Sequence, residues 1–267
     1  MDTYNDPSSG LTDLVQKTMA ELDAEWNDAV LYVPYQNEQV LLYEYAECVA
    51  VRALLRIHGL PFKLEQMPNA EFMSPTRRVP FLRLGKLLIA EFSPIVEFIG
   101  KKGLKLASTL ADTEKADLQA HLSLIEDILR NAELYLSWKD NETYKQVTSL
   151  RYGSVYLWPL YLWLPYLKRR ESLHYLKVVG WSSKSMEDVV QQCEKCFHAL
   201  SVKLGQKRYF MGDNPTELDA LAFGHFFTIL TTELPDMRIA NALKRCDNLV
   251  RFSSRFDEEF FGPSSVS

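Results

Sequence analysis

The stretch from residue 77 to residue 99, RRVPFLRLGKLLIAEFSPIVEFI, constrains the fold of this chain more than any other. Two short apolar runs, residues 79–84 and 87–90, are separated by Gly85-Lys86, which predicts a β-hairpin. Behind them, Ser93 can cap a helix whose first position is Pro94, where no amide hydrogen is needed. We therefore expect two paired strands followed directly by a helix.

The residues before this hairpin complete a small α/β unit. We predict a strand at residues 39–43, a helix with an apolar stripe over residues 46–57, and a second strand at residues 62–67. Gly59 and Pro61 end the helix between them. The order strand, helix, strand, hairpin and helix over residues 39–104 is a thioredoxin-like layout, of a size typical of a small domain.

Residues 1–38 are predicted to form an N-terminal extension with an amphipathic helix. Its apolar residues follow helical spacing: Leu11, Leu14, Val15, Met19, Leu22 and Trp26. Residues 2–28 are rich in acids with Lys17 as their sole basic residue, whereas a mitochondrial presequence is rich in Arg and a secretory signal has an apolar centre. No apolar run is long enough to span a bilayer, so we expect a soluble or peripheral protein.

Residues 105–262 are predicted to form an all-helical C-terminal domain, which makes the whole chain an α+β protein. Apolar stripes mark helices within residues 118–136, 186–204 and 249–260. Thr216-x-x-Asp219 begins another helix, LDALAFGHFFTIL, which is apolar almost all round and should be buried at the centre. Residues 140–184 form an unusually long insertion between helices, and residues 263–267 are predicted to be a flexible tail.

Composition and motifs exclude several classes of function. Thirty basic against 35 acidic residues give a net charge of −5, which argues against general nucleic-acid binding. Phosphate-loop, paired-His zinc and Gly-x-Ser-x-Gly motifs are missing from the sequence. Cys193 and Cys196 lie within an amphipathic helix and are expected to be buried small side chains, not a zinc or redox pair. His225 is expected to be a core histidine bonded to backbone, so we predict no metal or cofactor.

The insertion carries a run of thirteen apolar or aromatic residues, VYLWPLYLWLPYL, at residues 155–167. Pro159 and Pro165 are expected to break it, and three interpretations remain open: a buried helix covering the bundle, a surface for a protein partner, and a contact with the membrane interface. In the third, basic side chains would meet lipid phosphates. The candidate surface residues are Tyr156, Trp158, Tyr161, Trp163, Tyr166, Lys168, Arg169 and Arg170.

Two motifs resemble the glutathione transferase fold: Val79-Pro80 before a hairpin with Glu91 opening the next helix, and FMGDNPTELDAL at residues 210–221. The resemblance implies a cis bond before Pro80 and a Glu-Ser pair that holds glutathione at a helix N-terminus. Here the pair falls on Glu91 and Phe92, while Ser93 is one residue late. The resemblance therefore implies a degenerate site, made of Pro80, Glu91, Phe92 and Ser93, that has lost glutathione.

An alternative function follows from the same resemblance. A glutathione transferase needs a hydroxyl near the end of its first strand to stabilise the thiolate of glutathione. With the first strand predicted at residues 39–43, Tyr43 or Tyr45 lies near that place. A glutathione-dependent transferase that uses one of these two tyrosines is the alternative to a non-catalytic protein.

Longer stretches resemble the metaxin family, in particular its second, peripheral type: PNAEFMSPTRRVPFLRLG, AELYLSW, RYGSVYLWPL, Gly180-Trp181 and PTELDALAFGHFFTILTTEL. The resemblance implies a non-catalytic subunit on the cytosolic face of the outer mitochondrial membrane. It would act in the import and assembly of β-barrel proteins and as an adaptor for mitochondrial transport. The implied partners are the membrane-anchored metaxin of the first type, the sorting and assembly machinery and motor-adaptor proteins, with no cofactor.

Overall fold

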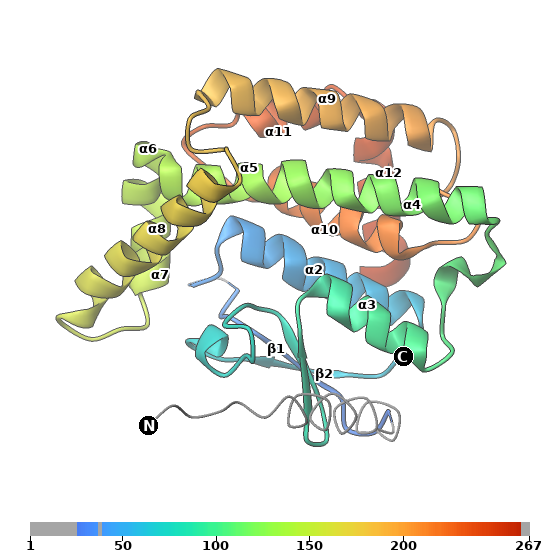
Figure 1. Ribbon diagram of the computed structural model, residues 1–267, viewed down its shortest axis with the longest axis horizontal. Helices are drawn as coiled ribbons and strands as arrows, with labels where there is room; N and C mark the ends of the chain where they lie inside the picture. Colours follow the sequence, from blue (N-terminus) through green and yellow to red (C-terminus); the bar gives the residue numbers. More distant parts are fainter. Residues whose placement is uncertain (1–25, 37–38, 263–267) are drawn as a thin grey trace, which may run out of the picture.

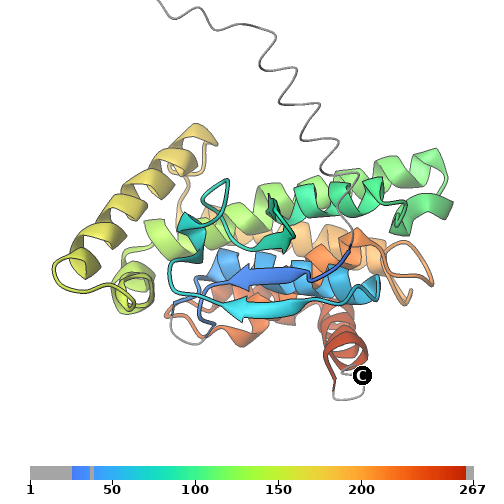
Figure 2. The same ribbon diagram turned by 90° about the horizontal axis from the view of Figure 1, so that it is seen from below.

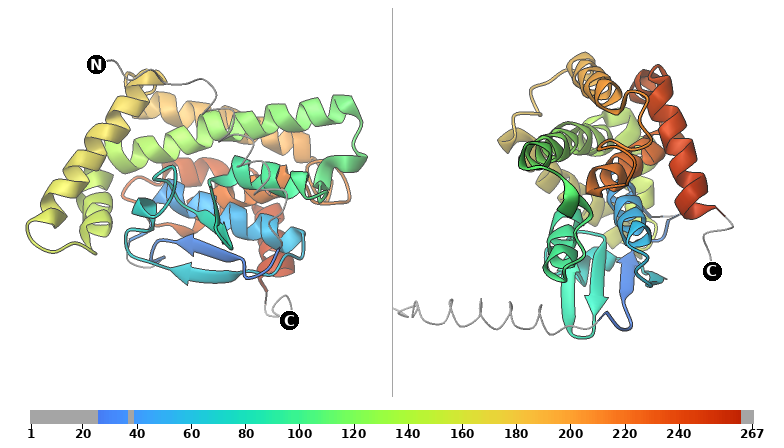
Figure 3. Two further views of the ribbon diagram at one scale, coloured as in Figure 1. Left: turned by 60° about the horizontal axis from the view of Figure 1, so that its bottom comes forward. Right: turned by 90° about the vertical axis from the view of Figure 1, so that its right-hand side faces the viewer.

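The computed structural model describes residues 26–36 and 39–262, which form a four-stranded sheet beneath stacked layers of helices (Figure 1). The strand order is β2-β1-β3-β4. β1 (Val30–Val33) runs parallel to β2 (Lys63–Gln66) and antiparallel to β3 (Phe81–Leu84), which forms the predicted hairpin with β4 (Leu87–Ala90). The helices α2 (Leu42–Ile57) and α3 (Phe92–Lys101) separate this sheet from the other helices (Figure 3, right).

The strand predicted at residues 39–43 is wrong. The first strand is β1, which lies within the segment assigned to the N-terminal extension, and Val40 and Leu41 instead lead into α2. Glu44 fixes this helix start, because its carboxylate accepts a hydrogen bond from the Leu41 amide at 3.4 Å. Of the predicted N-terminal helix only Trp26 lies within the described residues, and its indole donates to the Pro61 carbonyl at 3.0 Å. The tail at residues 263–267 lies outside them.

The C-terminal part is built of helices joined by loops, and its described residues form no β-strand, as predicted. Its first helix spans residues 112–139 and passes through two π-helical turns, Glu126–Arg130 and Tyr135–Lys139. The elements of the C-terminal part are, in order, α4 (Asp112–Ile125), α5 (Asn131–Leu134), α6 (Asn141–Thr143), α7 (Ser149–Gly153), α8 (Leu160–Val178), α9 (Met186–Leu204), α10 (Glu217–Thr231), α11 (Arg238–Lys244) and α12 (Asp247–Phe261). The first helix and α9 lie above α2 and α10 in Figure 1.

α10 is the predicted central helix, and it packs directly on α2. The two helices are so close at Gly224 that a Cβ atom there would lie 2.4 Å from the Ala46 carbonyl oxygen and 2.7 Å from the Ala50 Cβ. The start of α10 is held as predicted, because the Asp219 carboxylate accepts from the Thr216 amide and hydroxyl, both at 2.8 Å. This crossing joins the sheet-containing part to the helical part through buried backbone.

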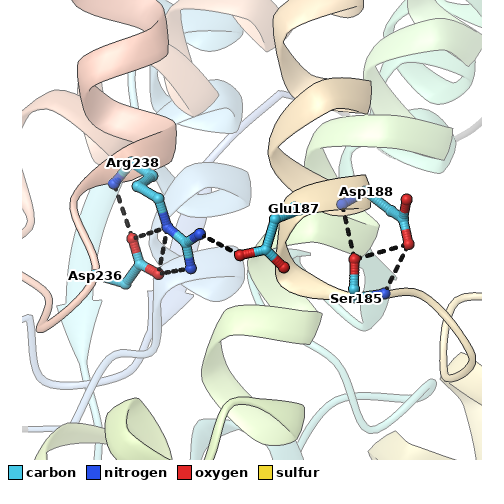
Figure 4. Close-up of polar contacts among 5 residues, drawn as sticks. All are labelled: Ser185, Glu187, Asp188, Asp236 and Arg238. Atoms are coloured by element: carbon cyan, nitrogen blue, oxygen red, sulfur yellow. Dashed lines mark hydrogen bonds and ion pairs between the residues drawn. The ribbon is translucent and has the colours of Figure 1, made fainter.

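The predicted insertion ends at Ser185, the residue that caps the start of α9. The Ser185 hydroxyl accepts from the Asp188 amide at 3.2 Å, and the Asp188 carboxylate accepts from the Ser185 amide at 2.9 Å, a capping box that begins α9 (Figure 4). Beside it, Arg238 at the start of α11 binds Asp236 and reaches Glu187 at 2.8 Å (Figure 4). Arg238 and Glu187 are 48% and 76% exposed, so their ion pair adds little to stability.

Candidate functional site

A cavity of about 340 Å³ lies where the loop before the hairpin, α2, the first long helix and α8 meet. Its walls come from four segments. From α2 come Tyr43, Glu44 and Glu47, and from the β-hairpin and the residues on either side of it come Thr76, Arg77, Arg78, Val79 and Glu91. The first long helix contributes Arg130 and Leu134, and α8 contributes Lys168, Glu171, Ser172, His174, Tyr175 and Val178. The cavity therefore adjoins the predicted degenerate site and is rich in charges of both signs.

The basic side chains nearest the predicted site are paired with the protein's own carboxylate. Glu91 accepts from Arg78 at 2.7 Å and from Arg130 at 3.5 Å. The peptide bond before Pro80 is cis, as predicted, and the Pro80 carbonyl accepts from the Glu91 amide at 3.0 Å. A ligand carboxylate at this helix terminus would have to compete with Glu91 for both guanidinium groups.

Ser93 departs from its predicted role as a helix cap, whereas Phe92 keeps the place of the missing serine. α3 begins at Phe92, so Ser93 lies in the first turn and does not cap the helix. Its hydroxyl donates to the Glu126 carboxylate at 2.7 Å, which adds a second acid beside the helix terminus. Phe92 is buried in the hydrophobic core and is not a lining residue of the cavity, so it removes a hydroxyl without filling the space.

Neither tyrosine of the alternative function is placed to activate a thiol. Both lie on α2, well after the end of β1. Tyr43 lines the cavity, but its hydroxyl donates to Glu44 at 3.1 Å, and burial, followed by the neighbouring carboxylates, raises its pKa well above the ordinary value. Tyr45 is half-buried, packs edge-on against Phe227 and does not line the cavity. The four carboxylates on the cavity wall, Glu44, Glu47, Glu91 and Glu171, would also repel a thiolate.

Glu44 makes the stability of the fold depend on pH. Burial, and then the charge of Glu71, raises the pKa of Glu44 from 4.5 to about 7. Between these two values the folded protein binds a proton that the unfolded chain has lost, so stability falls as pH rises through this window, by about 3 kcal/mol in all. We expect Glu44→Gln to remove this part of the slope, as measured by urea unfolding at about pH 5 and about pH 8.

The exposed carboxyl of Glu171 provides the matched control, because it lines the same cavity with its side chain 74% exposed. Glu171→Gln should leave the slope of stability against pH as it is in the wild type. An unchanged slope in Glu44→Gln would mean that another group carries the proton.

A buried carboxylate–histidine pair joins the first long helix to α10. His225 Nδ1 is 2.8 Å from Glu133 Oε1, and both side chains are almost wholly buried. The expected backbone partner of His225 is therefore wrong, and a carboxylate from the long helix takes its place. Burial lowers the pKa of His225, but the charge and hydrogen bond of Glu133 outweigh it and raise the pKa overall.

The cysteines are buried as expected. Cys193 and Cys196 lie in the core, and burial raises the pKa of both thiols, which keeps them protonated. Across residues 26–36 and 39–262 we find no cluster of three or more His, Cys, Asp or Glu side chains able to hold a metal ion.

The second candidate site is the outer end of the hairpin formed by α7 and α8. α8 lies along one edge of the molecule with its N-terminal end pointing outward (Figures 1 and 2). The tip, as we call it, has eight exposed large apolar side chains: Leu157, Trp158, Leu160, Tyr161, Leu162, Trp163, Tyr166 and Leu167. Trp158 is 77% exposed and Trp163 62%, so the interpretation of this run as a buried helix is wrong.

α8 does not break at Pro165, contrary to expectation. The helix begins directly after Pro159 and continues through Pro165, which is itself buried. Proline deprives the Tyr161 carbonyl of its usual intrahelical donor. α7 approaches closely here, because a Cβ atom on Gly153 would lie 2.9 Å from that oxygen. The hairpin is thus closely packed at its inner side while its tip remains exposed.

The predicted basic cluster after the tip is divided. Lys168 turns inward to Glu71 at 2.8 Å, and the Tyr152 hydroxyl from α7 donates to the other oxygen of the same carboxylate. Arg169 donates to the Trp138 carbonyl and lies over the Tyr144 ring. Arg170 is exposed, and Tyr156 is half-buried against Tyr152. Of the predicted surface residues, Trp158, Tyr161, Trp163, Tyr166 and Arg170 are therefore exposed on or beside the tip, whereas Tyr156, Lys168 and Arg169 make internal contacts.

No sequence pattern indicated the cavity carboxylates Glu44 and Glu47, or Glu71, which binds the cavity residue Lys168. Glu44 and Glu47 share one side of α2, a pattern that becomes visible only once that helix is known to begin at Leu42. Glu71 lies in a single 3₁₀ turn, η1 (Ala70–Phe72), and meets Lys168 across 97 residues of sequence. No local pattern connects such distant partners.

Two protein-family models match different parts of the chain. A model described as "Outer mitochondrial membrane transport complex protein" matches residues 48–169. A second, described as "Glutathione S-transferase, C-terminal domain", matches residues 193–256. In the part of the chain that the structure describes, no helix is both long enough and apolar enough to cross a membrane.

Similar curated proteins are metaxins. The chain is 46% identical over 226 residues to the metaxin-2 homolog of Caenorhabditis elegans, covering 84% of this chain and 98% of that protein. It is 41% identical over 234 residues to metaxin-2 of Homo sapiens, covering 88% and 89% of the two chains. Metaxin-1 of Mus musculus is more distant, with 27% identity over 223 residues, 80% of this chain and 70% of that protein.

Solved structures confirm the predicted glutathione transferase-like fold. Glutathione S-transferase III in its apo form superposes with a TM-score of 0.54 at 15% identity, covering 90% of this chain and 95% of that one. A glutathione S-transferase of Methylobacterium radiotolerans, in complex with glutathione sulfonate, gives a TM-score of 0.55 at 17% identity, with the same coverage. At such low identity the likeness concerns the fold alone.

Proposed function

The chain belongs to the metaxin-2 family, and from this we propose that it is a non-catalytic subunit of an outer mitochondrial membrane transport complex. It would lie on the cytosolic face as a peripheral protein, held by the membrane-anchored metaxin of the first type. Its proposed work is the import and assembly of β-barrel proteins with the sorting and assembly machinery. Motor-adaptor proteins are further proposed partners, through which it would serve mitochondrial transport.

The exposed tip carries this proposal. A cluster of large apolar side chains this exposed is unfavourable in water and is typical of a surface that another molecule covers. Trp and Tyr are also enriched in the cores of protein interfaces. The tip lies at the edge of the molecule, so an interaction there leaves the body of the protein free for other partners (Figures 1 and 2).

The cavity supports a non-catalytic role. Arg78 and Arg130 are paired with Glu91, and the Tyr43 hydroxyl is already engaged by Glu44. We expect the purified protein to show no glutathione conjugation above the uncatalysed rate with a standard electrophile, and no specific retention on glutathione resin. Conjugation that is abolished by Tyr43→Phe or Tyr45→Phe would instead establish the transferase.

Replacement of Trp158 and Trp163 by serine should release the subunit from its complex. Both indoles are exposed, so the double variant should unfold at the same temperature as the wild type while its co-purification with the anchored metaxin from mitochondria falls at least about tenfold. Val202→Ser is the matched control, since Val202 on α9 is 69% exposed and lies outside the tip. Unchanged co-purification of the double variant would contradict the proposed role of this surface.

A further inference from the structure

We infer that the tip inserts shallowly into the interface of an anionic lipid bilayer. The inference rests on the proposed function for its place at the outer mitochondrial membrane, and it names what covers the same surface. Three features of the tip carry it: the way the apolar side chains surround the helix, the charge of the hairpin, and the distance from the tip to the first exposed charges.

The first turn of α8 exposes apolar side chains in all directions. Leu160, Tyr161, Leu162 and Trp163 are consecutive, and each is at least 42% exposed. At about 100° per residue, four consecutive positions reach almost around the helix. A helix that docks in a protein groove presents one stripe of anchors at i, i+3, i+4 and i+7 and leaves the other side polar. Exposure all round instead fits an environment that surrounds the helix end, as lipid does.

The helical hairpin that carries the tip is positively charged, although the whole chain is acidic. Residues 143–170 contain no Asp or Glu but include Lys145, Arg151, Lys168, Arg169 and Arg170, in a chain of net charge −5. Lys168 is neutralised by Glu71, whereas Lys145 and Arg170 are exposed. The bordering carboxylates, Glu142 and Glu171, lie beyond this segment on either side. Exposed cations on the segment that carries an apolar tip complement anionic headgroups.

The length of the tip matches the depth of a bilayer interface. Arg170 follows Leu160 by about 15 Å along α8, at 1.5 Å per residue. A tip buried about 5 to 10 Å would place its leucines at the start of the acyl chains and leave Arg170 at the level of the phosphates. Trp and Tyr favour this boundary, because each has an apolar ring and one polar group. Insertion of this depth requires no spanning helix.

Flotation of the purified full-length chain with lipid vesicles tests the inference. We expect binding to vesicles of phosphatidylcholine with phosphatidylinositol and cardiolipin, and weaker binding to phosphatidylcholine alone. Replacing both indoles should lower the partition coefficient of the protein between membrane and water about 100-fold, since each ring contributes about tenfold. Val202→Ser should bind as the wild type does. Tryptophan fluorescence should be quenched by lipids brominated on the acyl chains in the wild type and not in Trp158→Ser/Trp163→Ser.

The outcomes separate this inference from the proposed function. If the chain does not float with anionic vesicles while the double variant still loses the anchored metaxin, the tip binds a protein, and the lipid inference is overturned while the proposed function stands. Flotation that the double variant retains in full would also overturn it. If vesicle binding depends on the indoles but no complex is recovered from mitochondria, the lipid contact is supported and the proposed function fails.

Discussion

Replacing Gly224 by valine is expected to destabilise the protein by about 3 kcal/mol or more, because it overpacks the contact between α2 and α10. The first added carbon would lie 2.4 Å from the Ala46 carbonyl oxygen, a backbone atom that can move only if α2 moves. The contact between α2 and α10 joins the sheet-containing part to the helical part. Separating these two helices would therefore destabilise both parts. Urea unfolding followed by circular dichroism measures the loss.

A second helical glycine provides the control. A Cβ atom on Gly100, in α3, would meet only the flexible side chain of Lys105, at 3.5 Å. Alanine is intrinsically better than glycine within a helix by about 1 kcal/mol, so Gly100→Ala should be neutral or stabilising. Gly224→Ala should already destabilise. Equal stabilities of the two alanine variants would show that α2 and α10 can move apart without cost.

Removal of Glu133 should cost about 3 to 5 kcal/mol, because it leaves His225 buried without its carboxylate. The same argument predicts recovery when the pair is replaced as a whole. Glu133→Met combined with His225→Phe should be more stable than Glu133→Ala by at least about 2 kcal/mol, since a buried pair can be exchanged for apolar side chains of similar volume. Thermal and urea unfolding of the variants measure both effects.

Arg238 supplies the matched exposed pair. Its bonds to Asp236 and Glu187 are geometrically as good as the buried pair, but water reaches the Arg238 guanidinium, which is 48% exposed (Figure 4). Arg238→Ala should therefore change the free energy of unfolding by no more than about 0.5 kcal/mol. A loss at Arg238 as large as that at Glu133 would contradict the assignment of the effect to burial.

The fold was predictable because its strongest patterns are local. The hairpin, the capping box at Thr216 and the apolar helix behind it are each specified within a few residues, and all three are confirmed. The first strand was misplaced because VLYV at β1 and the apolar residues before α2 both look like strands, and only pairing with β2 and β3 distinguishes them.

The sites were less predictable because they depend on contacts between distant residues. The sequence indicated that Glu91 and Phe92 had lost a glutathione site, but not that Arg78 and Arg130 would bind Glu91. Hydrophobicity alone favoured burial of residues 155–167, and only the position of α8 at the edge of the molecule exposes them. The binding of Lys168 by Glu71 likewise follows from the tertiary fold.

The carboxylate of Glu71 has a mechanical consequence. It holds α7 through Tyr152 and α8 through Lys168, so both arms of the projecting hairpin are fastened to η1 in the sheet-containing part. The helical hairpin of α7 and α8 is therefore fixed rigidly to the rest of the protein. A force on its outer end would rotate the whole molecule. Whatever molecule binds the tip therefore also sets the orientation of the rest of the protein relative to that partner.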